Sequence, residues 1–344
     1  MRSTVVKKFT KKFPGIFPRL ALLILIFCLL PCACDAGGPS SVTGHVAFIP
    51  SPAGNASYEL PLAGDSSSPE QWGLSVIMAP EAWQITSGGS GVLVAVLDTG
   101  IDRSHKDLAG RVVASINLTP SPTAGDLFGH GTHIAGIIAA ADDGDGITGL
   151  AYDCSLMNVK VAGDSGFCDP AVVAEGVRWA VDNGASVINL SLTVAEPSST
   201  LEDAVDYAWD KGAIVVAAAG NSLGSAPVYP AAYSNVIAVA ATDREGRLPC
   251  WSSHGSWVSL GAPGAGIYST LPGNSYGYKS GTSEAAVLVS GEAALLFTVV
   301  TDTNGNGRLN DEVRSRIEDS CDEVGTTGLG KGRINVLRAA AARP

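Results

Sequence analysis

The chain has 344 residues, a length that suits one large α/β domain or two small ones. It carries 22 basic and 33 acidic residues, a net charge of −11, and residues 1–36 hold six of the basic residues but only one acidic residue. The remainder is therefore strongly acidic, which argues against nucleic acid and anionic membranes as partners.

Residues 1–36 have the pattern of an export signal. A basic stretch leads into the apolar run "LALLILIFCLL" (20–30), and small residues follow around Cys34. The uncharged run ends at Asp35, and about 18 or more apolar residues are usually needed to cross a bilayer, so we expect no membrane span in the mature chain. The prediction is an exported protein, secreted, periplasmic or at the cell surface. Lipid attachment at Cys34 is a weaker alternative, because Pro31 stands where a lipoprotein signal usually has Leu.

Four cysteines lie beyond this signal. In an exported protein they allow two disulfides with three connectivities, and the sequence does not choose between these. Buried free thiols are the equally supported alternative. The four residues are Cys154, Cys168, Cys250 and Cys321.

Residues 37–68 are rich in Gly, Ser, Pro and Ala, which predicts a linker or tail with at most one short strand, near "HVAFI" (45–49). From Pro69 onward, short apolar runs alternate with amphipathic helical patterns. Strands that are apolar on both faces, separated by helices, predict an α/β domain over 69–344: a doubly wound, mostly parallel sheet with helices on both faces. The predicted strands are 92–98, 155–162, 186–192, 213–220 and 235–242, and the predicted helices between them are 171–184 and 201–212.

Ligands bind beyond the carboxyl ends of the strands in such sheets, so polar residues at these ends are the candidates for a site. Asp98 ends the first strand, although an Asp before Thr-Gly is also a common turn residue. His130 and His133 share one face of a helix, but a third metal ligand at helical spacing is missing. Ser283 begins another small-residue helix. Together an Asp, a His and a Ser supply a nucleophile, its base and a partner that orients the base.

Four segments carry a resemblance to a known family. They are "VAVLDTGID" (94–102), "GHGTHIAG" (129–136), "AAAGN" (217–221) and "SGTS" (280–283). In this order they resemble the Asp, His, oxyanion and Ser blocks of the subtilisin-like serine proteases, the subtilases, and the likeness runs from about Trp72 to Ala340. The resemblance implies a serine endopeptidase that acts on polypeptides, without an organic cofactor, and we expect a monomer.

The resemblance also implies a role for each matching residue. Ser283 is the nucleophile, His130 is its general base, and Asp98 holds the imidazole tautomer. The Asn221 side-chain amide and the Ser283 backbone N–H form the oxyanion hole. His133 is then a packing or hydrogen-bonding residue.

Extended peptide binds between two backbone segments in this family, by strand addition. We expect broad cleavage after medium to large apolar residues, but Thr193 stands where the family usually has Gly, and the loop after Asn221 is shorter than usual. Both changes reshape the primary pocket. The matching substrate positions are Gly166, Phe167 and Cys168 on one side, Ser191, Leu192 and Thr193 on the other, and Gly220 on the pocket wall.

Two segments suit calcium, because both place oxygen ligands in a turning loop. The first matches the family's high-affinity site: carboxylates of Asp107 and Asp143, with carbonyls of Ala141, Asp145 and Ile147. The second, "DTNGNGRLNDE" (302–312), resembles the first half of an EF-hand loop but has Val313 at the twelfth position. Its alternative is a turn followed by a helix capped at Asn310.

Two other functions compete with the peptidase. "GNSLG" (220–224) fits the G-x-S-x-G elbow of esterases, with Ser222 as nucleophile and Asp243 and His254 as partners, but Pro227 and Pro230 would break the helix that the elbow requires. The other alternative is a catalytically impaired subtilase fold that binds peptides or acts as an envelope scaffold.

Glu284 follows the nucleophile where the family usually has Met. At about 6 Å from the oxyanion and an effective dielectric of about 20, its charge would cost about 3 kcal/mol, whereas a carboxylate in water would cost well under about 1 kcal/mol. An acid in the first turn of a helix is otherwise favourable. We expect an active protease, slowed to an extent that depends on where this carboxylate points.

Overall fold

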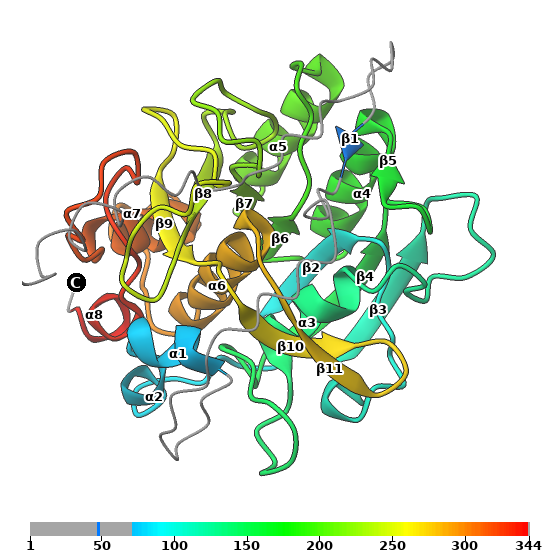
Figure 1. The fold of residues 1–344 in the computed structure, drawn as a ribbon, viewed down its shortest axis with the longest axis horizontal. Helices are drawn as coiled ribbons and strands as arrows, with labels where there is room; N and C mark the ends of the chain where they lie inside the picture. Colours follow the sequence, from blue (N-terminus) through cyan, green and yellow to red (C-terminus); the bar gives the residue numbers. More distant parts are fainter. Residues whose placement is uncertain (1–46, 49–70, 343–344) are drawn as a thin grey trace, which may run out of the picture. The chain divides into compact units, whose positions relative to one another are not determined.

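The computed structural model of the chain describes residues 47–48 and 71–342, all within the unit that runs from Gly37 to Pro344 (Figure 1). The predicted export signal and most of the predicted tail lie outside the described residues. The one short strand expected in the tail is observed as β1 (Ala47–Phe48). Within the described ranges no helix is long and apolar enough to cross a membrane.

A seven-stranded sheet forms the centre of the fold, with strand order β3-β4-β2-β6-β7-β8-β9, and every pairing in it is parallel. The chain builds outward from β2 in both directions, so the predicted doubly wound α/β architecture is confirmed. The strands are β2 (Leu93–Asp98), β3 (Val112–Asn117), β4 (Ser155–Lys160), β6 (Val187–Leu190), β7 (Ile214–Ala218), β8 (Val236–Thr242) and β9 (Leu260–Pro263).

Helices cover both faces of this sheet, because alternate side chains of each strand point to opposite sides. In β2, Val94 and Val96 belong to one hydrophobic core, whereas Ala95 and Leu97 belong to another. The first core also contains α3 and α6, and the second contains α4 and α5. These helices are α3 (Gly131–Ala139), α4 (Pro170–Asp182), α5 (Ser199–Asp210) and α6 (Thr282–Leu296).

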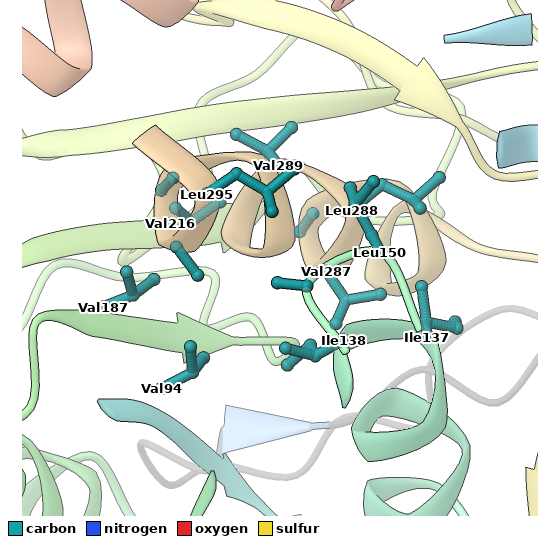
Figure 2. Close-up of a cluster of buried hydrophobic side chains, with 14 of the residues drawn as sticks. Val94, Ile137, Ile138, Leu150, Val187, Val216, Val287, Leu288, Val289 and Leu295 are labelled. Atoms are coloured by element: carbon teal, nitrogen blue, oxygen red, sulfur yellow. The ribbon is translucent and has the colours of Figure 1, made fainter. Parts of the chain in front are cut away.

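Helix α6 runs through the first core, and all fifteen of its residues are buried. Figure 2 shows Val287 and Leu295 of α6 packed toward Val94 and Val216 of the sheet and toward Ile138 of α3. A helix surrounded on all sides tolerates only small or apolar side chains, which accounts for its composition. Its two buried acids, Glu284 and Glu292, are therefore exceptions.

Shorter elements complete the fold. A hairpin of β10 (Ile267–Leu271) and β11 (Ser275–Lys279) packs on α3, and the two-residue strand β5 (Phe167–Cys168) pairs antiparallel with β1. The remaining elements are α1 (Trp72–Val76), α2 (Ala79–Ala82), the 3₁₀ turn η2 (Lys106–Leu108), α7 (Asn310–Asp319) and α8 (Val336–Ala341).

Candidate active site

The structure brings Asp98 and His130 together. Asp98 is the last residue of β2, and His130 stands at the start of α3. His130 Nδ1 lies 2.8 Å from Asp98 Oδ1 and 2.9 Å from Oδ2, and both residues are almost fully buried. Nδ1 therefore carries a proton and donates a hydrogen bond to the carboxylate, which leaves Nε2 able to accept a proton from a nucleophile.

Burial alone would lower the pKa of His130, because a buried imidazolium loses its hydration. The charge of Asp98 and the hydrogen bond to it outweigh this, and the pKa of His130 ends above its usual value. Asp98 also accepts a hydrogen bond from the Thr99 N–H at 2.7 Å, which fixes the carboxylate in place. The arrangement is that of an oriented general base.

A residue that the sequence analysis missed holds the segment before His130. Asp126 is buried, and its two carboxylate oxygens accept hydrogen bonds from the N–H groups of Gly129 and Thr132 at 2.7 and 2.8 Å. It also accepts from the hydroxyl of Thr99 at 2.8 Å, next to Asp98. An Asp three residues before a Gly-His step is the signal of such a turn.

Ser283 lies in the first turn of α6, which packs on α3, the helix that begins beside His130. The residue is 1% exposed. Its hydroxyl donates to the backbone carbonyl of Ser191 at 3.4 Å, and among the described residues no hydrogen bond joins it to His130. A serine hydroxyl rotates about one bond, and catalytic hydrogen bonds are often long before substrate binds.

Two hydrogen-bond donors lie close together beside Gly281: the side-chain amide of Asn221 and the backbone N–H of Ser283. Asn221 Oδ1 accepts hydrogen bonds from Thr282 N and Oγ1 at 2.9 and 3.0 Å, so the Asn221 amide nitrogen faces away from them. A Cβ placed on Gly281 would lie 3.1 Å from Asn221 Nδ2 and 3.6 Å from Ser283 N. The absence of a side chain at Gly281 leaves room for a group that accepts from both donors, as an oxyanion would.

Glu284 points into the protein. It is 2% exposed, and its Oε1 lies 3.4 Å from Nδ1 of His133, so of the two directions left open by the sequence the carboxylate does not take the one into water. Its Oε2 lies 2.8 Å from the position that a Cβ on Gly281 would occupy. Burial raises the pKa of Glu284, but His133, His130 and Lys279 together outweigh it, and the net pKa lies below the usual range. The cause of the pairing is the packing of α3 on α6.

The predicted substrate residues lie on two segments at the ends of strands. Gly166 precedes β5, and Ser191 and Thr193 follow β6, while buried Cys168 and Leu192 belong to the same hydrophobic core. A Cβ on Gly220 would lie 3.5 Å from the Thr193 methyl group, so Thr193 and Gly220 face each other. The edge of β5 bonds in antiparallel fashion to this chain's own β1, in the register Ala47 to Cys168 and Phe48 to Phe167.

The predicted calcium loop wraps around Asp107. This carboxylate is buried, makes no salt bridge among the described residues, and accepts from Ile147 N at 3.0 Å and from the Tyr276 hydroxyl at 2.9 Å. A Cβ at Gly146 would overlap it, so the loop backbone comes very close. Asp145 turns its side chain to Lys106 at 2.7 Å. Asp143 accepts from Asp145 N at 3.0 Å and is exposed.

A buried carboxylate beside a tightly turned loop suits Ca²⁺. The described residues contain no cluster of three or more His, Cys, Asp or Glu that could hold a metal, so any calcium there would rely on backbone carbonyls.

The loop at 302–312 is closed on itself. Asp302 accepts from the N–H groups of Gly305 and Gly307 at 2.6 and 2.8 Å, and the Asn304 amide donates to Asp311 at 2.6 Å. Helix α7 begins at Asn310, as the alternative reading expected, but the Asn310 side chain donates to the carbonyl of Trp209 at 2.9 Å instead of capping the helix. The expectation of a cap at Asn310 is therefore wrong.

Among the described residues no side-chain hydrogen bond or ion pair joins the esterase candidates Ser222, Asp243 and His254. Ser222 lies in a loop rather than at a helix start, with its hydroxyl 3.3 Å from that of Ser253. Asp243 pairs with Arg247 at 2.8 Å. Cys154, Cys168 and Cys321 are thiols, so the two-disulfide alternative does not occur.

Comparisons with known proteins agree with this geometry. The sequence profile of the subtilase family matches residues 89–330. Thermitase from Thermoactinomyces vulgaris is 44% identical over 278 residues, which cover 79% of this chain and 96% of thermitase. Subtilisin Savinase from Lederbergia lenta is 42% identical over 269 residues, covering 78% of this chain and 97% of that protein. The thermophilic serine proteinase of Bacillus sp. (strain AK1) is 43% identical over 273 residues, covering 78% and 66%. With this likeness along most of its length, the chain belongs to the subtilase family, the subtilisin-like serine proteases.

Proposed function

We propose that this chain is an exported serine endopeptidase that cleaves peptide bonds with Ser283 as nucleophile, His130 as general base and Asp98 as the partner of that base. The observation that carries the proposal is the buried pair of Asp98 and His130, with 2.8 Å between Oδ1 and Nδ1, where α3 packs on α6, the helix that has Ser283 in its first turn. An imidazole held in this tautomer has Nε2 as its only free acceptor.

The chemistry follows from these positions. Ser283 Oγ attacks the carbonyl carbon of the scissile bond while His130 Nε2 takes its proton, and Asp98 stabilises the resulting imidazolium. The carbonyl oxygen becomes an oxyanion that accepts from Asn221 Nδ2 and Ser283 N. His130 then returns the proton to the leaving amine, and water hydrolyses the acyl-enzyme by the same route.

Extended substrate would bind along the edge of β5 and along Ser191, Leu192 and Thr193. The pairing of β5 with β1 supports this, because it is the antiparallel bonding that strand addition requires. Gly220 and Thr193 form the wall of the primary pocket, for which we infer broad preference for apolar residues. We also infer a monomer, exported by the signal at residues 1–36, with calcium held by Asp107 and the loop at 141–147 as structural support.

The test compares hydrolysis of casein and of a small ester by the wild type, Ser283→Ala and Ser222→Ala. We expect loss of both activities in Ser283→Ala and wild-type rates in Ser222→Ala, which is the matched control directly after the oxyanion donor Asn221. A wild type without proteolysis would instead support the peptide-binding alternative. Inactivity of Ser222→Ala alone would overturn the assignment of the nucleophile.

A further inference from the structure

A second buried acid–base pair, formed by His133 and Glu284, lies beside the reaction centre. Its members come from different helices, α3 and α6, and both side chains are nearly inaccessible to water. The pair uses only one oxygen of the carboxylate, Oε1, at 3.4 Å from Nδ1. No step of the proposed mechanism uses either residue.

The contacts of His133 require one more proton than a neutral imidazole holds. Its Nε2 lies 3.2 Å from the carbonyl oxygen of Gly277, which can only accept, so Nε2 must donate. A neutral ring would then present the lone pair of Nδ1 to the Glu284 carboxylate, and two lone pairs repel. The geometry becomes favourable when a further proton lies between Nδ1 and Oε1, on either atom.

The other oxygen of Glu284 lies next to the oxyanion donors. Oε2 and the Asn221 amide nitrogen lie 2.8 and 3.1 Å from the same point, the place where a Cβ on Gly281 would be. Any net charge on the pair therefore acts on the space where negative charge develops during attack. With the shared proton the pair is neutral, and without it the pair is an anion.

We propose that the proton shared by His133 and Glu284 cancels the carboxylate charge beside the oxyanion hole and so sustains the rate of acyl transfer. This rests on the proposed function. His133 acts here as a positioning residue, since it touches neither substrate nor Ser283. The charged groups that face the pair are His130 from α3 and Lys279 from β11. Lys279, as a cation, weakens the effect of a lost proton.

Loss of the shared proton makes the effect depend on pH. Burial lowers the pKa of His133 and Glu284 only partly offsets this, so the net pKa lies below the usual value for histidine and the shared proton is lost as pH rises. As pH rises through that step, the pair becomes negative and formation of the oxyanion becomes harder. A neutral Gln at position 284 keeps the shape of the side chain and carries no charge at any pH.

The first experiment measures kcat from about pH 5 to pH 10 for the wild type and Glu284→Gln. The ratio of the variant's kcat to that of the wild type should rise with pH, on the order of tenfold, with KM changing little. In a double-mutant cycle, His133→Gln should lower kcat on the order of tenfold in the wild type but hardly at all in the Glu284→Gln background. A ratio that is constant with pH, together with additive mutations, would overturn the proposal.

A second measurement needs no activity. In the inactive Ser283→Ala variant, proton NMR at about pH 6 should show two far-downfield imidazole N–H signals, one from His130 and one from His133. Glu284→Gln in that background should remove or shift only one of them. If both signals are unchanged, the pair shares no proton and the proposal fails, whatever the outcome for Ser283. If Ser283→Ala remains a protease, the proposed function fails while the NMR result still stands.

Discussion

Thr282 holds the side-chain amide of Asn221 by two hydrogen bonds, 2.9 Å from its backbone nitrogen and 3.0 Å from its hydroxyl. The same hydroxyl accepts from the N–H of Gly220 at 2.9 Å. Thr282 therefore ties Asn221, the proposed oxyanion donor, to the helix that carries Ser283, the proposed nucleophile. Both hydrogen bonds end on Oδ1, so they determine which end of the amide faces the substrate.

Removal of the Asn221 amide, or of the Thr282 hydroxyl that holds it, should slow catalysis without abolishing it. Asn221→Ala should lower kcat by about 10²–10³, the loss known for this donor in subtilisin itself. Thr282→Val keeps the shape and the backbone hydrogen bond to Asn221 but removes the one from the hydroxyl, so the amide is held less firmly and we expect kcat to fall roughly tenfold with KM nearly unchanged. Thr282→Ser retains the hydroxyl and is the control. Steady-state kinetics on a peptide substrate decides the matter, and wild-type kcat in Thr282→Val would refute the positioning role.

The central fold could be predicted from the sequence because its strands are apolar on both faces. The runs that became β2, β4, β6, β7 and β8 are continuous and buried. The two outer strands were not predicted, for different reasons. β3 mixes buried and exposed residues at the sheet edge, and β9 has four residues, including Gly261 and Pro263. Such segments take their conformation from the neighbouring strand rather than from their own pattern.

The site could be predicted only as far as local motifs reach. Asp98, His130, Asn221 and Ser283 each sit in a recognisable segment, and their roles came from resemblance. The pairing of Glu284 with His133 could not be predicted, because the two residues are 151 positions apart and meet only through the packing of α3 on α6. Side-chain direction on a buried helix is a tertiary property.

The pH profile should report the raised pKa of His130. The general base works unprotonated, so kcat/KM should rise with pH through a midpoint above 6.5, the usual value for histidine. Asp98→Asn removes the charge that raises this pKa and the acceptor that selects the tautomer. The midpoint should fall, and kcat should drop by about 10⁴. A midpoint that is unchanged in Asp98→Asn would show that Asp98 does not set the pKa of the base.

Calcium should stabilise the fold through the loop around Asp107. In the Ser283→Ala background, which prevents self-digestion, a chelator should lower the melting temperature. A ligand at 100 times its Kd contributes about 2.7 kcal/mol. In Asp107→Asn the melting temperatures with calcium and with chelator should differ much less than in the parent, whereas in Asp302→Asn the difference should be unchanged. Calorimetry gives the answer, and an unchanged melting temperature of the parent with chelator would rule calcium out.

Thr193 should restrict the primary pocket. Its methyl group faces Gly220, where a Cβ would already lie 3.3 Å from Ser253 Oγ, so this wall has little free space. Thr193→Gly should raise kcat/KM for peptides with Phe before the scissile bond relative to those with Ala, by roughly tenfold. Thr193→Ser removes the methyl group alone and should give part of the gain. If the wild type, Thr193→Gly and Thr193→Ser all show the same preference for Phe over Ala, a residue other than Thr193 determines the specificity.

Glu292 should destabilise the fold increasingly as pH rises. It is fully buried in α6, neither carboxylate oxygen has a hydrogen-bond partner among the residues that the structure describes, and burial raises its pKa from 4.5 to about 8. Between those values the folded chain holds a proton that the unfolded chain has released, so the free energy of unfolding falls as pH increases through this range. Above about pH 8 the full penalty is present, at most roughly 5 kcal/mol.

Glu292→Met replaces the acid by an apolar side chain of similar length. In the Ser283→Ala background, urea unfolding should show it more stable than its parent, by a margin that grows from pH 5 to pH 9 by about 3–5 kcal/mol. Glu292→Gln separates charge from polarity, since its unpaired amide still costs stability but does not titrate in this range. The free energy of unfolding of Glu292→Gln should therefore be lower than that of Glu292→Met by the same amount at pH 5 and at pH 9. A margin that does not change with pH would mean that the acid finds a partner or water in solution.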